Sequence, residues 1–147
     1  MGGVKMTNKV RGTKFENKLC TQLNESGFWC RPMYPAPDGS QPFDVMAINS
    51  KGVLYCFECK DCLNDVFQLK RIEINQEVCL KRLMCQYKLE NRVLFAFNMS
   101  DNIYILNANI VLDKLVEYMF NGKNSKLDLD FIKANGITLE NFIKENK

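Results

Sequence analysis

The order of helical and extended patterns in this sequence predicts an α/β fold with a mixed central β-sheet flanked by helices. Apolar residues recur at helical spacing in three segments, residues 13–26, 73–89 and 111–120. Between these segments lie short apolar runs that turn-forming residues separate, a pattern typical of strands. The 147 residues are enough for one domain with a single core.

The N-terminal part of the chain predicts an arm followed by a helix. We expect residues 1–10 to form a flexible basic arm and residues 11–147 to form one domain. The helix of residues 13–26 ends at Gly27, because glycine suits the position after a helix C-terminus. Its apolar side consists of Phe15, Leu19 and Leu23.

A hairpin is predicted next along the chain. Residues 31–42 hold all four prolines and therefore favour a loop, which a short strand at residues 28–30 precedes. Strands over residues 43–49 and 53–60, with the turn-forming residues 50–52 between them, predict the hairpin itself.

Beyond the hairpin, the sequence predicts a second strand pair between helices. Residues 61–72 show no clear period. The further expected elements are a helix over 73–89, strands over 92–98 and 103–106, a helix over 111–120, a helical turn over 129–134 and a last helix capped by Thr138.

Composition excludes several classes of protein. Hydrophobic residues make up 46% and charged residues 25%, which is ordinary globular usage. The longest apolar runs have about five residues, whereas a membrane span needs about 18. The N-terminus has no apolar segment of a secretory signal. Seven cysteines at scattered spacing favour reduced thiols. We therefore expect a cytoplasmic or nucleoid-associated protein, with a phage or another mobile element among its possible origins.

The net charge of +3 is unevenly distributed. Residues 1–18 contain five basic residues and one acidic residue, and residues 66–92 contain six basic and three acidic residues. Residues 19–65 contain three basic and six acidic residues. Two basic segments that flank an acidic one predict contacts with a polyanion such as nucleic acid. The alternative is that these charges only solvate helix faces.

Three charged residues of the predicted hairpin suggest a chemical site. Glu58 and Lys60 point to the same face of their strand, because strand side chains alternate. Asp44 comes out opposite Glu58 if the hairpin is centred on residue 51, and side chains so paired have Cβ atoms about 5 Å apart. Two adjacent carboxylates repel unless a hard cation such as Mg²⁺ binds them. The alternative is an ordinary surface salt bridge on a hairpin.

Two helical residues are further candidates. Glu16 lies on the first predicted helix beside basic residues, and Gln76 lies on the second, after the basic residues Lys70 and Arg71. Either residue could instead be ordinary helix surface.

Five segments, in order along residues 11–137, together resemble the Holliday-junction resolvases of the RecU type within the PD-(D/E)XK nuclease superfamily. Arg11-Gly-Thr-Lys-Phe-Glu16 resembles their opening helix, Gln41-Pro-Phe-Asp44 their aspartate strand, and Phe-Glu58-Cys-Lys60 their Glu-X-Lys strand. Residues 67–76 are similar to the Phe-X-Leu element and glutamine helix of the RecU branch. Residues 126–136 resemble the C-terminal region of that branch.

The resemblance implies a restriction-endonuclease-like core that forms one nuclease domain over residues 11–147. It implies a Mg²⁺- or Mn²⁺-dependent endodeoxyribonuclease that makes paired symmetric cuts in four-way junctions during recombination or repair. The implied catalytic residues are Glu16, Asp44, Glu58 and Lys60. The implied metal ligands are Asp44, Glu58 and the carbonyl of Cys59. The expected DNA-binding residues are Arg11, Lys14, Arg31, Lys70, Arg71 and Gln76.

The resemblance also implies a homodimer. Residues 92–106 and 111–120 are richer in apolar side chains than one small sheet obviously needs, which leaves some of them for an interface. The candidates are Phe95, Phe97, Ile103, Tyr104, Ile105, Tyr118 and Phe120. The alternative is that all of them fill the core of the monomer.

Several other interpretations stay open. Cys56, Cys59 and Cys62 could hold zinc or an iron–sulfur cluster, although Cys56 and Cys59 would face opposite sides of one strand, and buried free thiols are the default. Trp29 and Tyr34 flank the proline-rich loop and could stack on bases, but we favour anchoring of the loop to the core. The protein could also be a restriction-type nuclease, or a catalytically inactive DNA-binding protein on the same fold.

Overall fold

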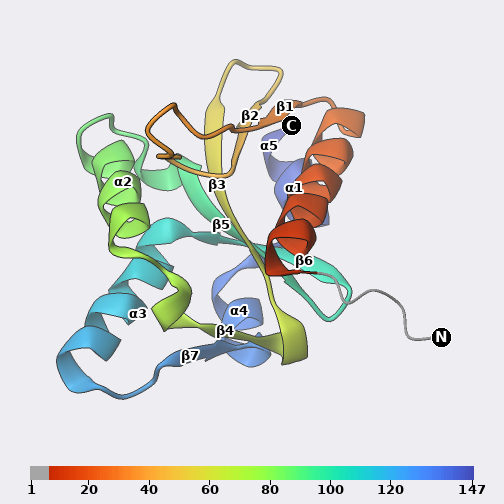
Figure 1. The fold of residues 1–147 in the computed structure, drawn as a ribbon. Coiled ribbons are helices and arrows are strands. Elements are labelled where there is room, and N and C mark those ends of the chain that lie inside the picture. Colours follow the sequence, from red (N-terminus) through yellow and green to blue (C-terminus); the bar gives the residue numbers. More distant parts are fainter. Residues whose placement is uncertain (1–6) are drawn as a thin grey trace.

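The computed structural model describes residues 7–147 as a mixed sheet with helices packed on both faces (Figure 1). The helices are α1 (Asn8–Glu25), α2 (Ile74–Cys85), α3 (Ala108–Asn121), α4 (Leu129–Asn135) and α5 (Leu139–Asn146). The strands are β1 (Trp29–Pro32), β2 (Val45–Ile48), β3 (Leu54–Asp61), β4 (Val66–Gln68), β5 (Val93–Met99), β6 (Asn102–Asn107), β7 (Lys126–Asp128) and β8 (Ile137–Thr138). Single 3₁₀ turns are η1 (Leu63–Asp65), η2 (Leu69–Arg71) and η3 (Glu90–Arg92).

The main sheet has the strand order β1-β2-β3-β5-β6-β8. β3 pairs with β5 in parallel, and the other neighbours in this sheet are antiparallel. The parallel pair needs a long crossover, which α2 provides. The predicted α/β class with a mixed central sheet is therefore confirmed.

The core lies on both faces of this sheet, because alternate strand residues point to opposite sides. α1 and α5 cover one face, where Leu19 and Phe142 pack against Phe57 and other inward residues. α2, α3 and α4 cover the other face, which is built around Phe95 and Phe97.

β4 and β7 form a separate antiparallel ribbon that the sequence did not reveal. Phe67 pairs with Leu127, and both side chains are buried. Gln68 pairs with Lys126 on the opposite side of the ribbon. Strands of three residues are too short to show a period of two, and the pairing joins segments that are distant along the chain.

Several predicted boundaries shift because caps determine where helices begin. α1 begins at Asn8, where the hydroxyl of Thr7 accepts the Val10 N–H, so residues 8–10 of the predicted arm are helical. The first six residues of that arm lie outside the described residues. The amide oxygen of Asn107 likewise starts α3 at Ala108. Thr138 caps α5 as predicted by accepting the Asn141 N–H.

The apolar residues expected at a dimer interface lie mainly in the core. Phe95, Phe97, Ile103, Tyr104 and Ile105 are all buried in the chain itself, so the proposed surplus of apolar residues in β5 and β6 does not exist. Their long, nearly continuous apolar runs follow from burial on both faces of a central sheet. From the predicted set, Tyr118 is partly buried and Phe120 is exposed. Over residues 7–147, no helix is both long and apolar enough to span a membrane.

Candidate active site

The β2–β3 hairpin brings the two predicted carboxylates together. Val45 pairs with Phe57, and extension of this register by one residue places Asp44 opposite Glu58, as the hairpin centre predicted. The backbone N–H of Asp44 donates to the carbonyl of Phe57 at 3.0 Å. Asp44 therefore lies just before the first residue of β2, beside the part of β3 that extends beyond β2.

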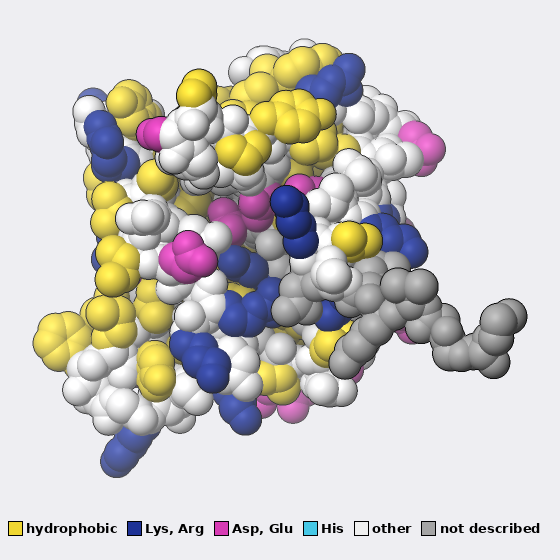
Figure 2. All heavy atoms as spheres, viewed as in Figure 1, with side chains coloured by type: hydrophobic (Ala, Val, Ile, Leu, Met, Phe, Trp, Pro, Cys, Tyr) yellow, Lys and Arg dark blue, Asp and Glu magenta, His cyan; other side chains and the backbone are white. Residues whose placement is uncertain are grey.

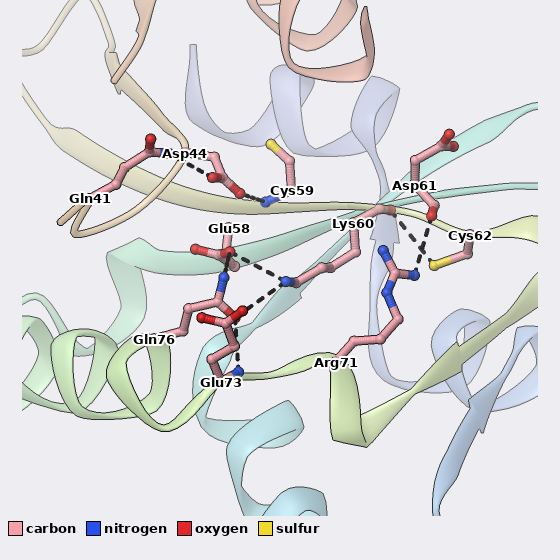
Figure 3. Close-up of polar contacts among 10 residues, drawn as sticks. All are labelled: Gln41, Asp44, Glu58, Cys59, Lys60, Asp61, Cys62, Arg71, Glu73 and Gln76. Carbon is pink, nitrogen blue, oxygen red and sulfur yellow. Dashed lines mark hydrogen bonds and ion pairs between the residues drawn. The ribbon is translucent and has the colours of Figure 1, made fainter. Parts of the chain in front are cut away.

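Glu58 and Lys60 point to the same side of β3 and form a buried ion pair (Figure 3). The Lys60 Nζ atom lies 3.5 Å from Glu58 Oε1, and the side chains are only 8% and 3% exposed. Gln76 bridges the pair, because its Nε2 donates to Glu58 Oε1 at 3.1 Å and its Oε1 lies 3.4 Å from Lys60 Nζ. A buried charge requires such partners, and here each one has them.

Gln76 occupies this position because of how α2 begins. Glu73 is the N-cap residue, and its backbone N–H donates to Gln76 Oε1 at 3.1 Å. A glutamine three residues after the N-cap commonly makes this contact. The start of α2 therefore fixes Gln76 beneath β3, and the alternative of an ordinary surface glutamine is wrong.

Asp44 is held by one contact across the hairpin and one with the preceding loop. Its Oδ2 accepts the N–H of Cys59 at 2.8 Å, and its Oδ1 accepts the side-chain amide of Gln41 at 2.8 Å. The carbonyl of Cys59 points to the same edge of β3, because the N–H and C=O of a strand residue lie on one side. The thiol of Cys59 points away from Glu58 and Lys60 (Figure 3).

Asp44, Glu58, Cys59, Lys60 and Gln76 line one cleft of about 680 Å³. Figure 2 shows acidic and basic side chains gathered in the hollow at the centre of the molecule. All four predicted catalytic side chains lie there, with three of the predicted DNA-binding residues: Glu16, Asp44, Glu58, Lys60, Arg11, Arg71 and Gln76. Glu16 reaches the cleft from α1, so it is not an ordinary solvent-facing helix residue.

Burial and the charge of Asp44 raise the pKa of two carboxyl groups of the cleft, Glu58 and Glu16. Burial, and then the nearby charge of Asp44, raise the pKa of Glu58 to about 8, although Lys60 acts in the opposite direction. Burial and Asp44 also raise the pKa of Glu16 to about 7. Such strongly perturbed groups in a cleft are typical of functional sites.

The donor groups of the cleft fit a hard divalent cation. Asp44, Glu58 and the Cys59 carbonyl offer oxygen atoms, and Mg²⁺ completes such sets with water. Among residues 7–147, no group of three or more His, Cys, Asp or Glu side chains lies close enough together to hold a metal. This ligand set consists of two carboxylates and one backbone carbonyl, so it does not depend on a third such side chain. A cation would also relieve the repulsion that raises the pKa of Glu58.

The cysteines do not form the alternative metal site. Cys56 and Cys62 are buried in the core on one face of the sheet, whereas Cys59 packs toward α1 on the other face. All seven cysteines are free thiols. The expected separation of Cys56 and Cys59 by strand alternation is thus present.

The remaining predicted DNA-binding residues do not line the cleft. Lys14, Arg31 and Lys70 are exposed outside it. The guanidinium of Arg31 lies over the ring of Trp29, 5.4 Å from its centroid. Tyr34 is 83% exposed, so the favoured interpretation that it anchors the loop to the core is wrong.

Several cleft residues were not singled out from the sequence, among them three with charged or amide side chains. Asp61 pairs with Arg11 at 2.8 Å, and Gln68 and Lys126 reach the cleft from the β4–β7 ribbon. Asp61 continues the polar end of β3 and could have been suspected on that ground. Lys126 begins a segment that resembles the RecU branch, but its pairing with Gln68 leaves no local signal.

The family model of RecU, described as recombination protein U, matches residues 48–145, which is more than half of the chain. The chain belongs to the RecU family. The predicted resemblance is thereby confirmed. Glu16 and Asp44 precede the matched residues of this RecU-family chain, so the geometry alone places them in the cleft.

A solved structure shows the same fold. Hjc of Archaeoglobus fulgidus, a Holliday junction resolvase from an archaeal hyperthermophile, matches with a TM-score of 0.62 and 18% sequence identity. The match covers 90% of the RecU-family chain and 99% of the archaeal chain. Among curated protein sequences, none matches. The predicted nuclease fold class is confirmed by this likeness.

Proposed function

We propose that this RecU-family protein is a metal-dependent endodeoxyribonuclease that resolves Holliday junctions by paired symmetric cuts in recombination or repair. The observation that carries the proposal is the convergence of Asp44, Glu58 and Lys60 in one cleft. Membership of the recombination protein U family and a fold like that of a junction resolvase support it. A catalytically inactive DNA-binding protein would have no use for a buried Glu58–Lys60 pair.

In this proposal Asp44, Glu58 and the Cys59 carbonyl hold Mg²⁺ or Mn²⁺, and Glu16 assists directly or through water. An ion held there would polarise the scissile phosphate and lower the pKa of an attacking water. Asp44 and Glu58 must then be ionised, and the raised pKa of Glu58 shows that burial opposes this in the protein alone. Lys60 supports the ionised form of Glu58 through their ion pair.

Lys60 has a second role in the proposed reaction. Its ammonium group orients the attacking water and offsets negative charge that develops on the phosphate. Gln76 holds both Lys60 and Glu58 through its amide, so it acts as a positioning residue. The pair is nearly excluded from solvent, which strengthens these electrostatic effects.

We propose that DNA backbone contacts come first from Arg11 and Arg71, which lie in the cleft. Lys14, Arg31 and Lys70 would contact phosphates farther from the cut. Each neutralised phosphate releases counterions, so affinity for junction DNA should fall steeply as salt increases. An affinity for junction DNA that stays constant between about 50 and about 200 mM salt would contradict these contacts.

We also propose that the protein acts as a homodimer. A four-way junction requires cuts in two symmetry-related strands, whereas one cleft of this size receives one scissile phosphate. A two-fold dimer presents two clefts with the symmetry of the substrate. Sedimentation at micromolar concentration, with and without junction DNA, measures this directly, and a strict monomer in both conditions would contradict it.

The decisive experiment compares four-way junction, flap, duplex and single-stranded DNA, each with and without Mg²⁺. We expect paired nicks at symmetric positions on opposing junction strands, and only with the metal ion. Asp44→Asn should abolish these nicks, whereas the matched exposed variant Asp113→Asn should cut normally. Scattered nicks on every duplex would leave a general nuclease, and equal cutting by Asp44→Asn would overturn the assigned chemistry.

A further inference from the structure

The cleft extends from the carboxylates in two directions that differ in charge. Both directions share Asp44, Glu58 and Gln76. We call the first the ribbon branch, and its lining includes Arg11, Lys60, Gln68, Arg71 and Lys126. We call the second the loop branch, and it is lined by Gly39, Ser40, Gln41, Glu73, Asn75, Val78 and Cys79. The described lining residues of the loop branch include no lysine or arginine.

The wall of the ribbon branch is built by the β4–β7 pair. Gln68 and Lys126 lie opposite each other in the register, so their side chains share one face of the ribbon. The other face buries Phe67 and Leu127 in the core, which fixes the ribbon in place. Gln68 and Lys126 must therefore point outward, and both line the cleft.

Arg71 adds a second cation to this wall. It ends the 3₁₀ turn that follows β4, and its guanidinium lies 5.4 Å from the centroid of the Phe67 ring. It also donates to the backbone carbonyl of Asp61 at 3.3 Å. These contacts orient the guanidinium without neutralising it, because neither partner is an anion.

The charge of the wall is not compensated by the described part of the chain. Arg11 pairs with Asp61, and Lys60 pairs with Glu58. By contrast, Lys126 and Arg71 form no ion pair with a carboxylate among residues 7–147. Figure 2 shows basic side chains in the lower part of the hollow, below the acidic ones. Two free cations and an amide beside a reaction centre match a phosphate group.

We propose that Lys126, together with Arg71 and Gln68, binds a backbone phosphate adjacent to the scissile one, on one side of the cut only. This inference rests on the proposed nuclease function. The strand on the other side of the cut lies in the loop branch, where Glu73 disfavours a phosphate and amide groups face a sugar or base. The protein therefore holds the cleaved strand asymmetrically, through the ribbon branch.

The test uses four-way junctions that each carry one neutral methylphosphonate, placed in turn at the phosphates on either side of the cut. We expect one modified position, on one side only, to weaken binding and cleavage by about tenfold, the usual effect of losing one charge-assisted contact. Lys126→Gln should cause a similar loss with the unmodified junction and lower the salt slope by about 1. Lys51→Gln, in the exposed β2–β3 turn, is the matched control and should behave as wild type.

The decisive measurement combines the two changes. Because Arg71 and Gln68 would still contact the phosphate in Lys126→Gln, the methylphosphonate should cost this variant clearly less than the factor of about ten that it costs Lys51→Gln. Lys126→Arg should restore most of the binding, because it keeps the positive charge. Equal interference on both sides of the cut, or losses that simply multiply in Lys126→Gln, would overturn the proposal.

Binding is measured with Ca²⁺ in place of Mg²⁺, so that this readout does not depend on cleavage. A junction that binds with the expected asymmetry but is never cut would contradict the proposed nuclease function and leave the phosphate site intact. If the junction is cut normally and Lys126→Gln does not affect binding, the phosphate site is contradicted and the proposed nuclease function stands. Lys126 is exposed, so its replacement should leave the thermal melting curve unchanged.

Discussion

The two halves of β3 are both largely buried but contain different chemistry. In the first half, Tyr55, Cys56 and Phe57 fill the core on both faces of the sheet. In the second half, Glu58 and Lys60 are almost as inaccessible, yet both have ionisable side chains. Buried apolar groups stabilise a fold, whereas buried charges oppose folding unless they are paired. One strand thus provides stability at one end and a reactive site at the other.

The change occurs where the neighbouring elements change. β2 pairs with β3 only as far as Val45 opposite Phe57, and beyond that point Asp44 and Gln76 take over as partners of β3. The raised pKa of Glu58 records the unfavourable burial of its charge. The difference between the halves teaches that burial alone does not identify core residues; the identity of the partners does.

The largest effect should come from the apolar half. Phe57→Ala removes a side chain that is 0% exposed and contacts the Phe142 ring at 5.7 Å between centroids. We expect a loss of about 3–5 kcal/mol in the free energy of unfolding, measured by urea denaturation. Tyr34→Ala removes an exposed aromatic ring and should cost less than about 0.5 kcal/mol. Similar losses for both variants would contradict the assignment of Phe57 to the core.

The charged half should instead determine catalysis. Glu58→Gln keeps the size of the side chain but removes the charge, and we expect junction cleavage to fall by about 10²–10³-fold. The measurement is the single-turnover cleavage rate at saturating Mg²⁺. Glu140→Gln, on the exposed side of α5, is the control and should cut normally. A cleavage rate of Glu58→Gln within about twofold of the wild-type rate would contradict a catalytic role for Glu58.

The pH dependence of stability separates the two halves further. The folded protein raises the pKa of Glu58 from 4.5 to about 8 and that of Glu16 from 4.5 to about 7, so it binds these protons more tightly than the unfolded chain. The resulting stability is present at low pH and is lost as the pH rises from 4.5 through about 8. In EDTA, the melting temperature should therefore fall over this window.

Glu58→Gln tests the origin of this slope, because glutamine does not titrate. The melting temperature of the variant should therefore change less with pH than that of wild type across this window, although the loss of the carboxylate beside Lys60 lowers its stability at every pH. Glu140→Gln should keep the slope of the wild type. An unchanged slope in Glu58→Gln would show that other groups produce it.

The smallest effect should come from the ion pair at the end of β3. Arg11 and Asp61 are 2.8 Å apart, and both side chains are nearly one-fifth exposed. Because the pair is neither fully exposed nor fully buried, Arg11→Gln should cost about 1–2 kcal/mol in the free energy of unfolding. A double-mutant cycle with Asp61→Asn measures the pair, and its coupling energy should shrink at high salt. A coupling energy above about 3 kcal/mol would place this pair with buried ion pairs instead.

The sequence predicted the parts of the site that depend on local geometry. Alternation along β3 placed Glu58 and Lys60 on one face, and the hairpin centre placed Asp44 opposite Glu58. The cap at Thr138 was equally local. In each case the interacting residues are close in sequence, or a single turn connects them.

Other features depended on contacts that no local pattern records. The pairing of Gln68 with Lys126 joins two segments that α2 and α3 separate along the chain. Likewise, the apolar side chains of β5 and β6 could not be assigned to core or interface until both faces of the sheet were covered. Charge clusters along the chain also did not separate Arg71, in the cleft, from Lys70, outside it.

The alternation of β3 also determines which changes of length the gene can tolerate. The turn between β2 and β3 is exposed at Lys51 and Gly52, so an added codon there only lengthens a surface loop. An added codon between Cys56 and Phe57 has a different result, because every later residue of the strand would change sides. Glu58 and Lys60 would then face α1, and the Cys59 side chain would enter the cleft. Over this short stretch, natural variation in the family should consist of substitutions and not of insertions or deletions.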